Sequence, residues 1–324
     1  MTETDMQTEE AVNSPTEKRV ECCPFCGGTA THRFLRAPDR FHGRIEAYDL
    51  VRCSGCSGVW LTDPPAPHDM SYHYDDDYHQ TIAIGGEQAA ASRWQRQRDL
   101  ILGFRQSGSI LDIGCSSGGF LGTLKGKAWK LYGIEMEAST AAKARANSGA
   151  EVFVGDAVDA PFPANGFDAI TCFDVLEHVY EPRQVLMKVL EWLKPGGIFY
   201  IVVPNIDSWE SRFFGSYWYG LELPRHLSHF SPRSLRHLTG SLGFEETSLI
   251  TRTSYVERSM GYVCSRVVGS VGVSLDPPSK PRRRGIPWRA ARKAIRMSLI
   301  AAFAKSASLA GSGASIEAVF TKKS

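Results

Sequence analysis

The sequence lacks any apolar run long enough to span a membrane, and its start lacks the basic and apolar segments of a signal peptide. It also lacks an excess of one charge, because 37 lysines and arginines stand against 35 acids for a net charge of +2. Nothing global therefore indicates a nucleic-acid-binding protein, and we do not expect nucleic acid as a partner. With 43% apolar residues, the composition is that of a globular protein, which we expect in the cytoplasm.

A disulfide framework is also missing, although the chain has eight cysteines. Four of them form two Cys-x-x-Cys pairs: Cys23, Cys26, Cys53 and Cys56. Each pair places two thiolates on one tight turn, and four soft ligands predict a tetrahedral structural Zn²⁺ site with no open position for a substrate. Cys22 could replace Cys23, although Cys-Pro-x-Cys is the usual knuckle, and four reduced cysteines without metal are the alternative. We expect a small zinc ribbon at 19–62 that needs its metal to fold.

A glycine turn between a buried strand and a helix is the centre of the chain. Ile110 and Leu111 end a short apolar run of the strand type. Gly114 and Gly118 allow a sharp turn in which a ligand can approach the backbone, and helical spacing resumes over 119–125. Because the N–H groups at the start of such a helix face a crevice, this segment is typical of a nucleotide-type cofactor site.

The details of this turn narrow the choice of cofactor. Its Gly-x-x-x-Gly spacing does not fit the dinucleotide pattern Gly-x-Gly-x-x-Gly. Asp112 lies at the mouth of the strand, where its charge would repel a pyrophosphate and attract a cationic amino acid head group. The segment resembles the first motif of the class I S-adenosylmethionine-dependent methyltransferases, an acid followed by a Gly-x-Gly-x-Gly turn. Asp112, Gly114 and Gly118 match that motif, and Ser116 replaces its central glycine.

The resemblance continues along the chain in the order of that family. A second strand ends in Glu135, where the family's acid accepts hydrogen bonds from the ribose hydroxyls, with Glu137 as a competitor. A third strand ends before Asp156, whose counterpart in the family contacts the adenine amino group. The segments 167–178 and 193–203 resemble the fourth strand with its cofactor-covering loop and the fifth strand.

The resemblance implies an α/β fold, a doubly wound, Rossmann-like, seven-stranded methyltransferase sheet, here with a small N-terminal zinc ribbon. It implies S-adenosylmethionine as the cofactor, and the residues expected to bind it are Asp112, Gly114, Cys115, Ser116, Gly118, Glu135, Asp156 and Phe173. We expect a disordered tail at 1–18 and the methyltransferase domain at 89–324. Between the ribbon and this domain, 63–88 is a linker whose tyrosine-rich part is either a solvated loop or a lid.

An aromatic-rich insert at 204–230 follows the fifth strand. It predicts either an acceptor pocket or lid, or a hydrophobic insert that packs on the core. Within it, 223–232 resembles a segment of methyltransferases that act on small molecules and sugars, in which a histidine near the cofactor's methyl group can act as general base. We expect His226 as the catalytic histidine and His229 as the second candidate, with a structural role as the alternative for each. His178 is expected to support the fourth loop.

The C-terminal part of the chain contains a basic insert that is not among the elements of the family. We expect a helix at 231–242 and strands at 244–251 and 315–322. The insert at 276–311 is rich in lysine and arginine and has no acid after its first residue. Its expected helix, 288–305, would touch anionic lipid as a peripheral contact at the inner face of the membrane, cradle a phosphorylated acceptor, or pack with a solvated basic face. A polybasic contact with RNA is a further alternative.

Methyl transfer from a sulfonium is an in-line displacement that needs no metal, so the zinc is expected to be structural. A hydroxyl or an acidic carbon as acceptor also has to lose a proton, which suits a histidine with a pKa near neutrality. We expect O-, C- or N-methylation of a small molecule, such as a sugar or a lipid-linked saccharide. An rRNA or tRNA methyltransferase and a catalytically silent binding module are the alternatives, and the sequence does not set the oligomeric state.

Overall fold

A computed structural model describes residues 22–74, 87–252, 255–256, 258–263, 302–303 and 305–323. The tail expected at 1–18 and residues 75–86 of the linker lie outside these ranges. The same holds for most of the basic insert and of its expected helix, 288–305. None of the described helices is long and apolar enough to cross a membrane.

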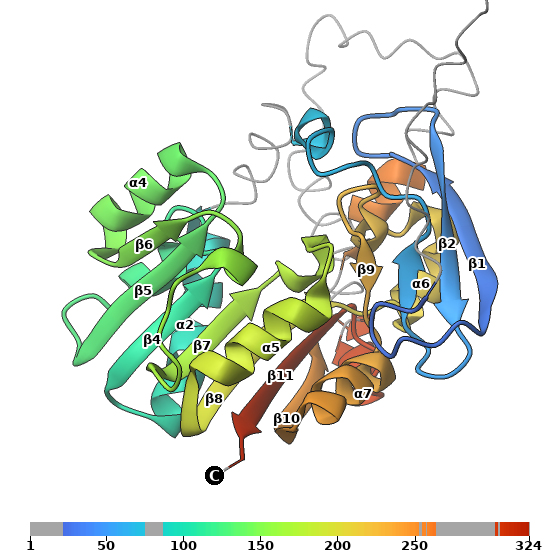
Figure 1. Cartoon of the computed structure of the whole chain (residues 1–324). Helices are drawn as coiled ribbons and strands as arrows, with labels where there is room; N and C mark the ends of the chain where they lie inside the picture. The colour runs from blue at the N-terminus through green and yellow to red at the C-terminus, as the bar shows by residue number, and fades with distance from the viewer. Residues whose placement is uncertain are drawn as a thin grey trace, which may run out of the picture.

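A seven-stranded mixed sheet is the centre of the described structure, with the strand order β10-β11-β8-β7-β4-β5-β6 (Figure 1). Its strands are β4 (Gly108–Ile113), β5 (Trp129–Glu135), β6 (Glu151–Val154), β7 (Phe167–Phe173), β8 (Leu193–Pro204), β10 (Phe244–Arg252) and β11 (Ser315–Lys322). The strands β4 to β8 are parallel, whereas β11 is antiparallel to both β8 and β10. From β4 the chain adds strands first on one side and then on the other, which confirms the doubly wound fold.

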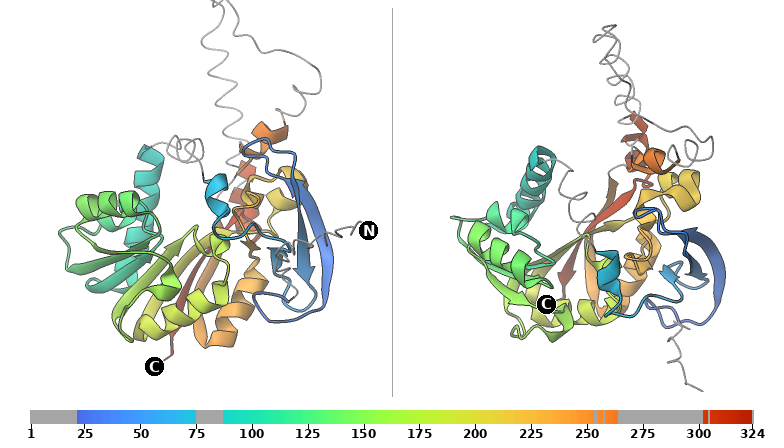
Figure 2. Two further views of the ribbon diagram at one scale, coloured as in Figure 1. Left: turned by 45° about the horizontal axis from the view of Figure 1, so that its top comes forward. Right: turned by 90° about the horizontal axis from the view of Figure 1, so that it is seen from above.

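Helices cover both faces of this sheet (Figure 2). One core joins the sheet to α2 (Glu87–Phe104), α3 (Gly119–Gly122) and α4 (Ala138–Ser148), and a second joins it to α5 (Pro182–Trp192) and α7 (Pro232–Leu242). Along β4, Ile110 packs in the first core, and Leu111 and Ile113 pack in the second. Because side chains alternate along a strand, Asp112 shares the face of Ile110, which is the face covered by α2.

The cysteine-rich segment forms a second sheet together with a distant part of the chain. Its order is β1-β2-β3-β9, and its strands are β1 (Thr31–Pro38), β2 (Ala47–Cys53), β3 (Val59–Leu61) and β9 (Ser228–His229). β9 belongs to the aromatic-rich insert, and it pairs with β3 through Val59 opposite His229 and Trp60 opposite Ser228. The ribbon is therefore continuous with the insert, which the sequence did not predict.

The aromatic-rich insert divides into an exposed and a buried part. It contains α6 (Trp209–Phe214) and the 3₁₀ turns η4 (Gly215–Tyr217) and η5 (Tyr219–Leu221). Phe213 on α6 is 79% exposed, whereas Trp218 and Phe230 are buried. Trp218 and Leu221 share one apolar core with Leu50 of β2. The later half of the insert thus packs on the ribbon.

Two expected helices have different outcomes. The helix expected at 119–125 is shorter, because α3 ends at Gly122 and the N–H groups of Leu124 and Lys125 bond the carbonyls three residues back. The helix expected at 231–242 is confirmed as α7. Ser231 caps its first turn by accepting a hydrogen bond from the Ser234 N–H, and Gly243 ends it with a φ of 101°.

Candidate functional site

The loop after β4 needs glycine at two positions. Gly114 has a φ of 71°, and a Cβ there would lie 2.3 Å from Cγ2 of Val175. Gly118 has a φ of 80°, and a Cβ there would lie 3.0 Å from the Ala144 backbone. Ser116 also has a positive φ, 48°, at the place of the motif's central glycine. The backbone of this loop therefore keeps the conformation of a glycine turn despite the serine.

Glu135, at the end of β5, ties this loop to the start of α4. Its Oε2 accepts from the Ser116 N–H at 3.0 Å, and its Oε1 accepts from the Glu137 N–H at 3.1 Å. Glu137 has a different task, because its carboxylate caps α4 by accepting from the N–H groups of Ser139 and Thr140. Hydrogen bonds to both residues lower the pKa of Glu137 to about 2. The geometry thus separates the two competing acids and places Glu135 at the loop.

Asp112 is a buried carboxyl beside this loop, with only 4% of its surface exposed. The Thr171 hydroxyl on β7 donates to its Oδ1 at 2.6 Å. Burial raises the pKa of Asp112 to about 7, although the Thr171 hydrogen bond and the charge of Arg93 act in the opposite direction. Arg93 itself, on α2, pairs with Asp174 at 2.6 Å. Proton gain or loss at Asp112 is therefore possible near neutral pH.

The three other predicted cofactor residues differ in what their side chains contact. Cys115 is buried, and its Sγ would lie 2.6 Å from a Cβ on Gly133 of β5, so its side chain points into the sheet. Phe173 is also buried, and its ring lies 5.0 Å from the ring of Phe120. Asp156 is exposed after β6, where it caps a short 3₁₀ turn by accepting from the Val158 N–H at 3.0 Å.

Helix α2 supplies residues that the sequence did not single out. The Trp94 ring lies 6.2 Å from the Phe120 ring and 6.1 Å from the Phe173 ring. A Cβ on Gly119 would lie 2.8 Å from Trp94 Nε1, so this helix packs closely against the start of α3. The sequence could not predict that Arg93 and Trp94 reach across to the end of β7, because that contact depends on tertiary packing.

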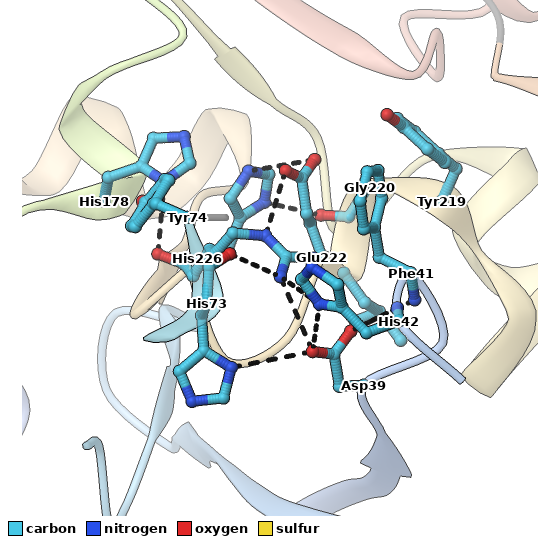
Figure 3. Close-up of polar contacts among 12 residues, drawn as sticks. Asp39, Phe41, His42, His73, Tyr74, His178, Tyr219, Gly220, Glu222 and His226 are labelled. Carbon is cyan, nitrogen blue, oxygen red and sulfur yellow. Dashed lines mark hydrogen bonds and ion pairs between the residues drawn. The ribbon is translucent and has the colours of Figure 1, made fainter. Parts of the chain in front are cut away.

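Three histidines lie together near the loop after β7, and Figure 3 shows two of them, His178 and His226. The rings of His178 and His226 are edge to face with centroids 4.6 Å apart, and those of His226 and His229 are 6.1 Å apart. Burial lowers the pKa of His178 to about 3 and of His229 to about 4, and it lowers the pKa of His226 well below its usual range. All three imidazoles are therefore neutral at physiological pH.

Backbone carbonyls fix the orientation of these rings. Nδ1 of His226 lies 2.9 Å from the Gly220 carbonyl, and Nδ1 of His178 lies 3.1 Å from the Arg225 carbonyl and 2.9 Å from the Tyr74 hydroxyl. Because a carbonyl only accepts, each Nδ1 carries the proton and each Nε2 carries the lone pair. His178 thus connects the loop after β7, which it is expected to support, to the insert and the linker.

Glu177 completes this group. It is 1% exposed, and neither carboxylate oxygen has a hydrogen-bond partner in the described part of the chain. Burial and the nearby Asp174 raise its pKa well above the usual range. One ligand atom from each of Glu177, His178 and His226 lies within 4.8 Å of the others. The sequence alone does not single out Glu177, because only the tertiary structure shows that it is buried and has no hydrogen-bond partner among the described residues.

A buried ionic network joins the ribbon to the residues around His226 (Figure 3). Asp39, after β1, is fully buried and lies 2.8 Å from Nδ1 of His42. Arg225, also fully buried, lies 3.5 Å from Asp39 and 3.4 Å from Glu222. Oε2 of Glu222 in turn lies 3.7 Å from Nε2 of His226. The ribbon thus helps to hold the segment that carries His226.

The four predicted zinc ligands lie together. The Sγ atoms of Cys23 and Cys56 are 3.5 Å apart and those of Cys26 and Cys53 are 3.6 Å apart, and all four lie within 4.8 Å of one another. Four thiolates at about 2.3 Å from one zinc ion would be roughly 3.8 Å apart, so this donor set fits the metal. Cys22 is exposed and outside the group, which favours Cys23 as the ligand.

Comparisons with known proteins agree with this geometry. A family model described as "Methyltransferase domain" matches residues 87–249. The ubiquinone biosynthesis O-methyltransferase of Cronobacter sakazakii is 30% identical over 178 residues, which cover 47% of this chain and 70% of that protein. A possible histamine N-methyltransferase of Thermotoga maritima has a similar fold, with a TM-score of 0.51, 19% identity, and coverage of 78% of this chain and 98% of the other.

A methyltransferase of Archaeoglobus fulgidus gives a TM-score of 0.50 at 16% identity, with coverage of 76% of this chain and all of the other, again a likeness of fold. The family match spans the glycine turn, Asp112 and Glu135 in one continuous domain. On these grounds the chain belongs to the class I S-adenosylmethionine-dependent methyltransferases and is an enzyme of that family.

Proposed function

We propose that this enzyme transfers a methyl group to a hydroxyl oxygen of a small-molecule acceptor. The observation that carries this proposal is the neutral imidazole of His226, whose Nε2 lone pair lies beside the loop that follows β7. A hydroxyl is a weak nucleophile until it loses its proton, and a lone pair here can take that proton or hold a cation that acidifies the hydroxyl. The relative from Cronobacter sakazakii, named as an O-methyltransferase, supports oxygen as the acceptor atom. A sugar or a lipid-linked saccharide is one acceptor of this class.

We propose that the cofactor lies along the carboxyl ends of β4, β5 and β6. Asp112, with the backbone of Gly114, Cys115, Ser116 and Gly118, would hold the methionine end. Glu135 would accept from the ribose hydroxyls, and Asp156 from the adenine amino group. Phe173 would form the wall of the site on the side of β7, because its ring packs against the Phe120 ring of α3. Support comes from the positive φ values of Gly114, Ser116 and Gly118, which give the loop the backbone conformation of a glycine turn.

We also propose that Cys23, Cys26, Cys53 and Cys56 hold a structural Zn²⁺. The four sulfurs already have tetrahedral-type spacing, and the Gly58 N–H lies 3.4 Å from Cys56 Sγ as an outer donor. A Cys₄ set leaves no position for a substrate, so this ion would stabilise the ribbon and take no part in the chemistry.

Replacing His226 with alanine is expected to lower methyl transfer about 10²- to 10⁴-fold while cofactor affinity stays the same, because His226 acts on the acceptor. The measurement is transfer of radiolabelled methyl from S-adenosylmethionine to the small-molecule fraction of a cell extract. His237→Ala, at an exposed position on α7, is the matched control and should keep full activity. His229→Ala should cost less than His226→Ala. Unchanged transfer by His226→Ala would remove this residue from the mechanism.

The pKa of Asp112, about 7, predicts that cofactor binding strengthens as the pH rises. Below that pH the carboxyl is protonated and does not attract the cofactor's ammonium group, so binding releases a proton. We expect the Kd of S-adenosylmethionine to fall roughly tenfold between about pH 6 and about pH 8, measured by calorimetry. Asp112→Asn should bind weakly at both values with no such dependence. Equal wild-type Kd values at the two pH values would contradict this assignment.

A further inference from the structure

We propose that Glu177, His178 and His226 form a second metal site, distinct from the four cysteines, that binds one divalent transition-metal ion. This inference rests on the proposed function, because it assigns His226 a specific way of activating the acceptor. The residues come from two places in the chain. Glu177 and His178 lie on the 3₁₀ turn η3 (Leu176–His178) after β7, and His226 lies just before β9. The N–H of Leu227 donates to the Glu177 carbonyl at 2.8 Å and holds the two segments together.

The spacing of the three groups is that of a metal site that needs only a small contraction. Their ligand atoms lie within 4.8 Å of one another. Three equally spaced ligands at roughly 2.0–2.2 Å from one ion are at most about 3.8 Å apart. A shift of each ligand atom by up to about 0.6 Å would therefore bring all three into contact with one ion.

The buried carboxylate is the second observation. Glu177 has almost no exposed surface, and neither of its oxygens has a hydrogen-bond partner among the described residues. An isolated buried carboxylate is strongly unfavourable unless it is neutralised or paired with a cation. The two histidines beside it direct Nδ1 at backbone carbonyls and not at the Glu177 carboxyl. Without a cation this carboxyl is neutralised by a proton, and a bound divalent ion would take the place of that proton.

The orientation of the two histidines is the third observation. Each ring has Nδ1 at hydrogen-bond distance from a backbone carbonyl, Arg225 for His178 and Gly220 for His226. Histidines that ligate metals usually donate one ring N–H to a carbonyl or a carboxylate in this way, which leaves the other nitrogen available as a ligand. The carboxylate of Glu222, 3.7 Å from Nε2 of His226, borders the site as a further oxygen.

The donor set indicates the ion and its task. Two imidazoles and one carboxylate suit Mn²⁺, Fe²⁺, Co²⁺ or Zn²⁺, whereas Mg²⁺ and Ca²⁺ prefer oxygen ligands alone. Three protein ligands leave positions for the hydroxyl oxygen of the acceptor, whose pKa the ion would lower. The proton then leaves to water. The oxygen forms a bond to the methyl carbon, and the electron pair of the broken S–C bond stays on sulfur, which becomes a neutral thioether.

Mn²⁺ binding to the full chain, with its zinc in place, tests this site. Free Mn²⁺ has a six-line electron paramagnetic resonance signal that is lost on binding, and the soft thiolates of the ribbon disfavour Mn²⁺. We expect about one Mn²⁺ per chain for the wild type and at least tenfold weaker binding for Glu177→Gln. Glu181→Gln, an exposed carboxylate at the start of α5, is the matched control and should bind as the wild type does.

Thermal unfolding gives a second readout that does not depend on activity. Mn²⁺ should raise the unfolding temperature of the wild type and of Glu181→Gln and leave that of Glu177→Gln unchanged. Without Mn²⁺, Glu177→Gln should be about as stable as the wild type, because it replaces a buried carboxyl that has no hydrogen-bond partner among the described residues with a neutral group of similar size. A wild type that binds no Mn²⁺, or a Glu177→Gln variant that binds it equally well, would overturn the metal site. If such a wild type still methylates a small molecule, the metal site fails and the proposed function stands. If the wild type binds Mn²⁺ but methylates no small molecule, the metal site stands and the proposed function fails.

Discussion

The Cys56→Ser variant is expected to lose its zinc, to unfold at a temperature lower by about 10 °C or more, and to lose methyl transfer. Cys56 is 1% exposed and belongs to the same apolar core as Phe25 and Phe230. The rings of Phe25 and Phe230 are 5.0 Å apart, one from the ribbon and one from the insert. Because the two parts share a core and a sheet, loss of the metal should disturb the segment that carries His226 as well as the ribbon.

Metal content by atomic absorption, with thermal unfolding of the same samples, measures this effect. Cys22→Ser is the matched control, since Cys22 is an exposed cysteine next to a predicted ligand. It should keep one zinc per chain and the wild-type unfolding temperature. The account of the ribbon would be wrong if Cys56→Ser kept both its zinc and its stability.

The Gly114→Ala variant is expected to bind S-adenosylmethionine at least about 100-fold more weakly than the wild type. Its new Cβ would lie 2.3 Å from the Val175 side chain. The φ of 71° at this position is also one that residues other than glycine rarely adopt. The loop would have to move, and with it the backbone that faces the cofactor. Equilibrium dialysis with S-adenosylhomocysteine measures the loss without any need for an acceptor.

Two further variants separate local strain from general damage. Gly103→Ala, on α2 with open space around it, should bind the cofactor normally and be slightly more stable. Adding Val175→Ala to Gly114→Ala should recover part of the affinity, because it removes the clash and leaves the unfavourable φ. Wild-type affinity in Gly114→Ala alone would show that this loop is not at the cofactor.

The main sheet could be predicted from the sequence because each of its signals is local. The apolar run before Asp112 and the glycine spacing after it need only a few neighbouring residues to be recognised. The order of the motifs along the chain then indicated the family and, through it, a doubly wound seven-stranded sheet. Pairs of cysteines at short spacing gave the four sulfurs of the ribbon for the same reason.

Contacts between distant segments could not be predicted in this way. β9 has two residues, too few for any periodic pattern, and its pairing with Val59 and Trp60 joins segments far apart in the sequence. The sequence gives no sign that Glu177 lacks a partner, because its burial depends on how the insert folds over the loop after β7. The hydrogen bond between Thr171 and Asp112 likewise follows from the register of β4 against β7.

The most direct test of the account is a crystal structure of this protein with S-adenosylhomocysteine. We predict that its ammonium group lies within hydrogen-bond distance of the Asp112 carboxyl and its ribose hydroxyls within reach of Glu135. The sulfur should face the loop that carries Glu177 and His178. A nucleoside bound elsewhere, with the backbone of Gly114 and Gly118 covered by protein side chains, would contradict the account.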